Sequence, residues 1–407
     1  MVSSCFYRIV SFRLRMRLRY VLGLTLMCAA CVAGGAPRMP ASDAEILETL
    51  PTRPGDPAAV ELRRMRDTLA ANPRNADAAE RLARRYFDLA MAEGDPRYVG
   101  YAEAALRPWP ETTAAPVDIL LLHGMLRQYR HDFPRGMADF ELALQADPSN
   151  SEARAWRAAI FMVQADYAAA RRECELLAEH ASHLHATACL AYVDATTGHA
   201  RAAYGRLAAA LAQRSGVDPG FLVWILNRLA EMAWRMGDLA APERHFRAAL
   251  ALGVDDNFLL AEYADFLLER GRAAEVLPLL QKWGRSDTLL LRLALAARAQ
   301  KLPEAEKYAR TLGERFADAA LRGEKLHLQE EARYLLDLKG DARAALAAAV
   351  ENYRTQREPR DALILIEAGL AARDPAAAVP ALQWLESSGF ESARMQLAAA
   401  KLKALKP

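Results

Sequence analysis

Apolar and small residues recur along this chain at the spacing of α-helices that bury one face. With Val117 counted as position 1, such residues fall at positions 4, 8, 20, 24 and 27, and a proline follows at position 32. This spacing predicts two helices packed as a pair, within a unit that repeats about every 34 residues. The residues are Leu120, Gly124, Gly136, Phe140, Ala143 and Pro148.

The turn between the two helices of a unit, near position 16, is the best marker of the repeat. It is often acidic and recurs at intervals of 34, 33, 39, 34, 29, 40 and 33 residues, of which loops such as 215–220 explain the longest. The pattern predicts about nine helix pairs and a C-terminal capping helix over 391–405. The turns are expected at Asp132, Asp166, His199, Asp238, Arg272, Lys301, Asp341 and Asp374.

The fold class predicted by this pattern is all-α. Alternating segments typical of strands are almost absent from the chain. A length of 407 residues with 53% apolar content would allow two or three domains, but a repeat array can run as one continuous core. We therefore expect a single solenoid over residues 56–407, most regular over 117–184.

The spacing of Leu120, Gly124, Gly136 and Phe140 resembles the tetratricopeptide repeat, or TPR. The segment at 84–108, RRYFDLAMAEGDPRYVGYAEAALRP, is similar to exported bacterial TPR proteins and lipoproteins of uncharacterised function. The resemblance implies a TPR-type α-solenoid whose first helices line a concave groove, where characterised members contact their ligands.

The N-terminus has the pattern of a secretory signal peptide over residues 1–33. A basic flank precedes a short apolar run, and Met16 is interpreted as the true start. The sequence MCAAC, which ends at Cys31, resembles a bacterial lipobox, although Cys28 stands where that family prefers an aliphatic residue. The resemblance implies lipidation of Cys31 and an outer-membrane anchor. Cleavage near Ala33, which would release a soluble periplasmic protein, is the alternative.

Prolines recur over residues 34–55, which predicts a tether rather than a packed element. The formal charge of the whole chain is +2, but five of the arginines lie in the first nineteen residues, so the folded body is close to neutral. A near-neutral body without a Lys/Arg-rich run argues against nucleic acid as a main ligand.

Two cysteines, Cys174 and Cys189, lie beyond the signal peptide. They fall on helix faces that meet in a stack of such repeats, and an exported protein enters an oxidising compartment. The sequence therefore allows a disulfide between them, with two buried free thiols as the alternative.

A cluster of histidines at His180, His183 and His185 could supply nitrogen ligands to zinc or copper. It lies at a repeat junction, and no distant fourth ligand is indicated. A metal-handling periplasmic protein is thus the alternative function, and no cofactor is predicted.

Catalytic motifs such as GxSxG, SxxK and GxxxxGK[ST] are absent from the sequence. We therefore expect a non-catalytic scaffold of the bacterial cell envelope that binds a protein or peptide in the concave groove. Aromatic residues with a few carboxylates suit such a surface, although a register error of one would make the same residues core. The predicted groove residues are Tyr192, Trp224, Asn227, Glu231, Trp234, Phe258 and Asp265.

Overall fold

The computed structural model describes Ser42, residues 57–109, Thr112 and residues 114–405. The predicted signal peptide, the lipidation site at Cys31 and the tether apart from Ser42 lie outside these residues. The chain divides into two compact units, Met1–Val60 and Glu61–Pro407, and the second carries the repeats.

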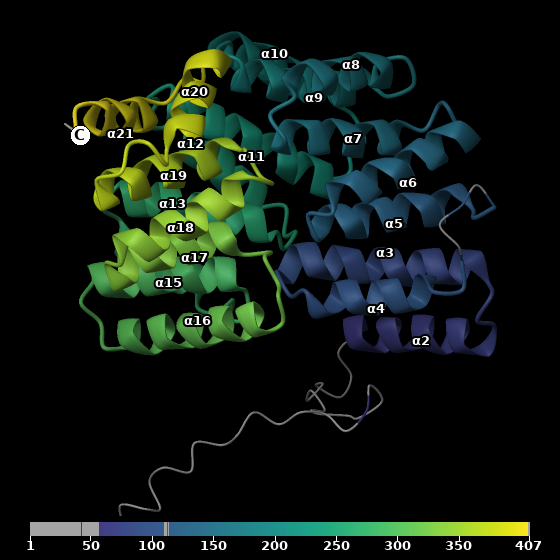
Figure 1. Cartoon of the computed structure of the whole chain (residues 1–407). Helices are drawn as coiled ribbons and strands as arrows, with labels where there is room; N and C mark the ends of the chain where they lie inside the picture. The colour runs from purple at the N-terminus through teal and green to yellow at the C-terminus, as the bar shows by residue number, and fades with distance from the viewer. Residues whose placement is uncertain (1–41, 43–56, 110–111, 113, 406–407) are drawn as a thin grey trace, which may run out of the picture. The chain divides into compact units, whose positions relative to one another are not determined.

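The described residues form α-helices and one π-helix and contain no strand (Figure 1). The first half contains α2 (Pro57–Ala71), α3 (Ala76–Glu93), α4 (Arg97–Leu106), α5 (Val117–Tyr129), α6 (Phe133–Ala146), α7 (Ser151–Val163), α8 (Tyr167–Leu177), α9 (His183–Thr196), α10 (Ala200–Ala212) and α11 (Pro219–Arg235). The second half contains α12 (Ala241–Leu250), α13 (Asn257–Glu269), α14 (Ala273–Leu280), α15 (Asp287–Ala299), α16 (Glu304–Leu321), α17 (Leu328–Arg333), η2 (Tyr334–Lys339), α18 (Ala342–Tyr353), α19 (Pro359–Ala372), α20 (Val379–Ser388) and α21 (Ala393–Lys403).

Within the described residues, the helices from α3 to α20 form nine pairs, with α17 and η2 together serving as the first helix of the eighth pair. Helix α2 precedes the pairs and α21 follows them. The predicted all-α solenoid with about nine helix pairs is confirmed.

Seven of the nine pairs in the described residues are closed by the same local hydrogen bond. The amide of Asp132 donates to the carbonyl of Arg127 five residues earlier (2.9 Å), after His131 has turned the chain with a φ of 59°. This geometry satisfies carbonyls at the helix end that would otherwise lack a partner. The same bond is donated by Asp166, His199, Asp238, Arg272, Leu302 and Asp374.

The sixth turn lies one residue later than the sequence predicted. Lys301 is the left-handed residue, with a φ of 56°, and the closing bond is donated by Leu302. Glycine holds the left-handed position in turns such as that of Gly271, whereas His131, Ala165, Lys301 and Arg373 hold it in others, so glycine alone does not mark the register of the turns.

The α5–α6 pair shows why small residues recur in the sequence. Gly124 faces the ring of Phe140, which is fully buried, and a Cβ at Gly124 would lie 2.5 Å from Phe140 Cε1. A Cβ at Gly136 would lie 3.2 Å from the Gly124 carbonyl oxygen. The two helices therefore approach more closely than larger side chains would permit.

Replacing Gly124 with alanine is expected to lower the free energy of unfolding by about 1–2 kcal/mol, because Phe140 has no free space to move into. Gly205 within α10 is the matched control, since nothing lies within 4 Å of its Cβ position. Gly205→Ala is expected to raise stability by about 0.5–1 kcal/mol through helix propensity. Urea unfolding checks both values, and equal effects at the two glycines would contradict the packing argument.

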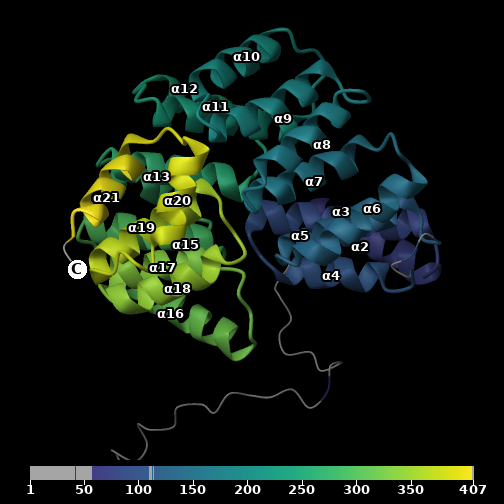
Figure 2. The same cartoon turned by 45° about the horizontal axis from the view of Figure 1, so that its top comes forward.

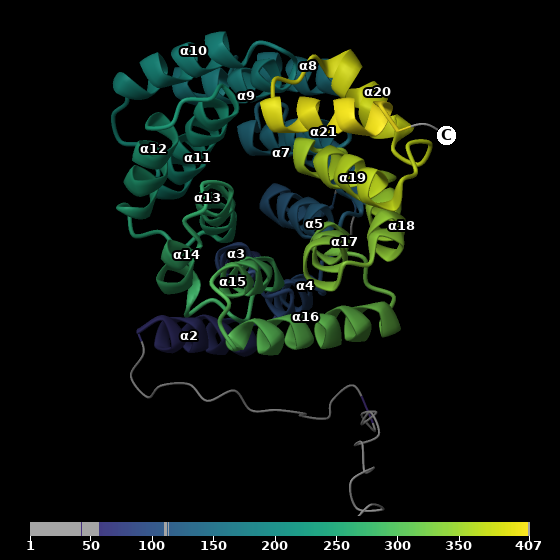
Figure 3. The ribbon, with the colours of Figure 1, turned by 90° about the vertical axis from the view of Figure 1, so that its left-hand side faces the viewer.

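The unit Glu61–Pro407 winds back on itself (Figures 2 and 3). The Arg357 amide donates to the Val163 carbonyl (2.7 Å), and Trp384 Nε1 donates to the Tyr167 hydroxyl (2.7 Å). The Ala200 amide donates to Glu391 Oε2, also at 2.7 Å. The C-terminal helices therefore pack against the middle of the solenoid, where they cover part of its concave face. No helix among the described residues is long and apolar enough to cross a membrane.

Candidate functional site

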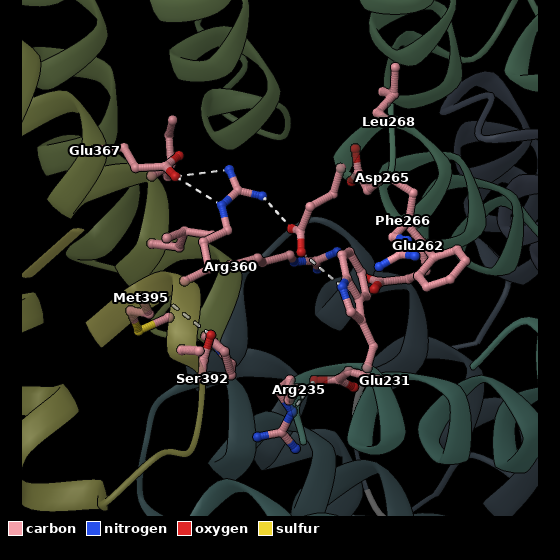
Figure 4. A pocket seen from close by; sticks show the side chains of 18 of the residues that line it. Glu231, Arg235, Glu262, Asp265, Phe266, Leu268, Arg360, Glu367, Ser392 and Met395 are labelled. Carbon is pink, nitrogen blue, oxygen red and sulfur yellow. Dashed lines mark hydrogen bonds and ion pairs between the residues drawn. The ribbon is translucent and has the colours of Figure 1, made fainter. Parts of the chain in front are cut away.

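The concave face of the second half of the solenoid contains a pocket of about 670 Å³. It is lined by the first helices of five successive pairs, α11, α13, α15, α17 and α19, and by the capping helix α21. In Figure 4, Glu231, Glu262 and Phe266 lie on one side of the pocket, and Glu367, Ser392 and Met395 lie on the other. This volume falls in the range of ligand-binding pockets, about 300–1,000 Å³.

Three of the seven predicted groove residues line this pocket, and the structure does not bring the other four to it. Asn227 is buried, with 4% of its surface exposed, and Trp224 stacks on Phe221 with ring centroids 5.9 Å apart. The three in the pocket are Glu231, Trp234 and Asp265.

The remaining two predicted groove residues contact the C-terminal part of the same chain. The Tyr192 hydroxyl donates to Glu358 Oε1 at 3.5 Å, and the guanidinium of Arg360 lies 5.2 Å from the Phe258 ring centroid. A long-range contact within the chain thus occupies the surface that sequence reasoning had left open for a partner.

Asp265 forms a partly buried charge cluster with two arginines of the pocket. Its Oδ2 accepts from Arg292 Nη2 (2.7 Å) and Arg333 Nη1 (3.0 Å). Burial by itself would raise the pKa of Asp265, but the two guanidinium groups outweigh burial and hold this pKa at about 2. Asp265 is therefore ionised, and it neutralises one buried and one partly buried arginine.

The other charged residues around the pocket are mostly paired. Glu231 contacts Arg228 (2.7 Å), while Arg394 bridges Glu269 (3.1 Å) and Glu367 (2.8 Å). These pairs balance the charges of the groups, but Nε of Arg228 and Nε of Arg235 are buried without a hydrogen-bond partner among the described residues.

Glu262 is different, because no hydrogen bond or ion pair within the described part of the chain joins its carboxylate to another residue. It is partly buried and lines the pocket. Burial, followed by the nearby charge of Glu231, raises the pKa of Glu262 to about 7. Arg228 and Arg360 lower this pKa only in part, so near neutral pH the carboxylate is about half ionised, and no arginine or lysine among the described residues forms an ion pair with it.

The wall around Glu262 is partly apolar. The rings of Trp234 and Phe266 meet edge to face, with centroids 5.6 Å apart, and Phe390 also lines the pocket. Gln329, of which 7% is exposed, contributes an amide that forms no hydrogen bond with the described residues. The pocket thus offers the partly exposed ring of Trp234 together with two polar side chains that form no hydrogen bond with the described residues.

The three histidines of the predicted metal cluster are not grouped as ligands. A hydrogen bond joins His185 Nδ1 to Ser182 Oγ (2.7 Å), and the His185 ring stacks on Phe221 at 4.0 Å. His183 Nε2 lies 3.5 Å from Thr187 Oγ1. Among the described residues, no group of three or more His, Cys, Asp or Glu side chains could hold a metal ion. The start of α9 and its packing on α11 direct these rings to separate partners.

Cys174 in α8 and Cys189 in α9 are joined by a disulfide, with their Cα atoms 5.5 Å apart. The bond links the second helix of one pair to the first helix of the next. It lies apart from the pocket and has no direct part in its chemistry.

Sequence reasoning missed Glu262, Gln329, Arg333, Arg360 and Arg394. A local signal existed only for Glu262, which is one of the few polar residues in the apolar helix NFLLAEYADFLLE. The other four belong to α17, α19 and α21, and their relation to α13 depends on how the superhelix curves.

No protein-family model matches the chain, and no curated protein matches it. Among solved structures it is similar to a chain of the APC/C hetero-tetramer Cut9–Hcn1, with a TM-score of 0.39 and 15% identity over 85% of this chain and 52% of that one. It is also similar to yeast Tom70 (TM-score 0.41, 12% identity, 86% of each chain) and to the P58(IPK) TPR domain (0.21, 16%, 78% of this chain and 94% of that one). The chain spans about half the length of the Cut9–Hcn1 chain that it matches.

Small residues stand at the helix crossings of five pairs, four residues after the turn, whereas Pro242 and Val276 occupy this position in two others. At this position Ala170, Ala203, Ala345 and Ala378 are each 0% exposed. Gly136 occupies the same position in its own pair, where it lies close to the Gly124 carbonyl. A small residue at this point in units of about 34 residues is the signature of one architecture. The chain has the tetratricopeptide-repeat fold. Its pocket therefore lies on the concave face of a TPR solenoid, formed by first helices, as the resemblance implied.

Proposed function

We propose that this protein is a non-catalytic binding scaffold that receives a segment of a protein partner in the pocket between α11 and α21. The observation that carries the proposal is the pocket itself, which first helices of five successive pairs build from aromatic, carboxylate and guanidinium side chains. Large rigid aromatic residues and arginines supply most of the affinity of protein interfaces. A preformed surface of this kind also loses little entropy on binding.

We also propose that the protein acts in the bacterial cell envelope, either free in the periplasm or anchored through Cys31. The leader pattern and the resemblance of residues 84–108 support this location. The disulfide between Cys174 and Cys189 supports it as well, because such bonds persist in oxidising compartments.

Photo-crosslinking in the cells that make the protein tests the pocket proposal. Leu239, which is 62% exposed and lies at the pocket, is replaced by a photoreactive residue, and Leu321, 83% exposed at the end of α16, serves as the control position. We expect a discrete protein adduct from position 239 and none from position 321. The adduct should disappear when Ala393→Trp fills the pocket, since Ala393 is an exposed residue of its lining.

Equal capture from positions 239 and 321 would show that the pocket has no special role. An adduct that persists in the Ala393→Trp variant would place the partner elsewhere on the solenoid. Thermal unfolding of this variant shows whether the fold is retained, which the exposure of Ala393 leads us to expect.

A further inference from the structure

The carboxylate of Glu262 lines a pocket in which the neighbouring carboxylates have partners. Glu231 pairs with Arg228 at 2.7 Å, Asp265 with Arg292 at 2.7 Å and Glu269 with Arg394 at 3.1 Å. Glu262 has no comparable partner within the described residues. A partly buried carboxylate that forms no hydrogen bond or ion pair of its own is costly, so the site favours a ligand that supplies a direct partner.

Two further features of the pocket match a positive ligand. Gln329, more than nine-tenths buried, has an amide oxygen that can accept a hydrogen bond from an ammonium or guanidinium group. Trp234, which is partly exposed, lines the same pocket and offers a ring face or edge to the stem and head of a basic side chain. Neither feature depends on the ionisation of Glu262.

We infer that the pocket takes a basic side chain, lysine or arginine, from the partner segment, with Glu262 as its counter-charge. This inference rests on the proposed function and adds the chemistry of the partner to it.

An acidic ligand is the opposite possibility, because Arg270 lines the pocket without a partner among the described residues. Arg270, however, is exposed, so water solvates its charge already. Glu262 is partly buried and gains more from a new counter-charge than an exposed arginine does. The pocket is therefore expected to bind a positively charged side chain rather than a negatively charged one.

The groups that face Glu262 determine how binding should depend on pH. They are Glu231 and Arg228 on α11, Asp265 on α13 and Arg360 on α19. Because the pKa of Glu262 is raised to about 7 in the free protein, its ionised fraction increases roughly tenfold between pH 6 and pH 8. A lysine or arginine stays positive over this range, so affinity should rise about tenfold with it.

A library of hexapeptides, acetylated and amidated so that only side chains carry charge, tests the inference with the full chain. Peptides retained by the immobilised protein are sequenced, and their affinities are measured at pH 6 and pH 8. We expect enrichment of lysine and arginine, together with an affinity that increases about tenfold from pH 6 to pH 8. In Glu262→Gln the affinity at pH 8 should fall about tenfold and the pH dependence should vanish. Glu314→Gln, on the exposed face of α16, should behave as the unmodified chain does.

The possible failures are distinguishable. If the chain retains no peptide that Ala393→Trp releases, the proposed function fails. If pocket-dependent peptides are retained but are enriched in acidic or purely apolar residues, the proposed function stands and the inference is overturned. Unchanged affinity in Glu262→Gln overturns the inference too, and the melting temperature of that variant verifies that it is folded.

Discussion

Replacing Asp265 with asparagine is expected to lower the free energy of unfolding by about 3 kcal/mol, because it removes the carboxylate that lies closest to two arginines, one buried and one partly buried. The side chain of Arg292 is 5% exposed, so water replaces little of the lost carboxylate there, whereas Arg333 is 18% exposed and keeps Asp337 Oδ2 at 3.7 Å from its Nε. Glu330, 3.8 Å from Arg292 Nη1, remains as a weaker partner, which limits the effect. Asparagine keeps the volume of aspartate, so the loss measures charge rather than packing.

The same contact predicts a dependence on pH. The pKa of Asp265 in the folded chain, about 2, lies below its ordinary value of 3.8, because the two arginines outweigh the opposing effect of burial. Its stabilising contribution is therefore complete above about pH 4 and is lost as the pH falls through 2. Urea unfolding at pH 7 measures the main effect, with Asp318→Asn on the exposed face of α16 as the control. A difference between the two variants of less than about 1 kcal/mol would show that the cluster adds little stability.

The repeat architecture could be predicted because its determinants are local in sequence. Gly124 and Phe140 are sixteen residues apart and pack against each other within one pair, so their spacing alone indicates the crossing of two helices. The turns are local too, and they were placed correctly except at Lys301, where the closing bond is donated one residue later, by Leu302. A turn whose closing hydrogen bond joins residues only five apart can be recognised from the sequence.

The occupancy of the concave face could not be predicted, because its contacts span most of the chain. Tyr192 and Glu358 are 166 residues apart, and Tyr167 and Trp384 are 217 residues apart. Helix periodicity shows that a residue such as Phe258 faces inward, but the curvature accumulated over several pairs decides what it meets there. The sequence therefore predicted a groove, whereas the structure reduces it to a pocket.

The pocket residues, too, divide into those that their position on one helix predicts and those that depend on contacts between distant helices. Trp234 and Asp265 were predicted as groove residues from their position on a first helix, and both line the pocket. The partners that decide the chemistry of the site, Arg333 and Arg394, arrive from helices far along the chain. Whether a carboxylate such as Glu262 is paired or unpaired is a property of that assembly and cannot be read from helix spacing.

Replacing Glu262 with glutamine is expected to raise the free energy of unfolding by about 2–3 kcal/mol at pH 8 and to change it little at pH 5. Burial and the nearby charge of Glu231 raise the pKa of Glu262 in the folded chain from 4.5 to about 7. A carboxyl group whose pKa is raised by folding does not lower the free energy of unfolding at a pH below 4.5, the pKa that it has in the unfolded chain. The cost grows as the pH passes from 4.5 to 7 and is complete above 7. Glutamine has no charge to desolvate and should remove that cost.

Urea unfolding of the original chain and of Glu262→Gln at pH 5 and pH 8 provides the measurement, and Glu314→Gln is the control that should show no difference at either pH. A stabilising effect that grows with pH, combined with loss of binding at pH 8, would mean that Glu262 lowers stability and is retained for recognition, as expected where a buried charge serves a ligand. If Glu262→Gln instead destabilises the chain at pH 8, the carboxylate is already satisfied within the fold. Its role as the counter-charge for a basic side chain would then have to be abandoned.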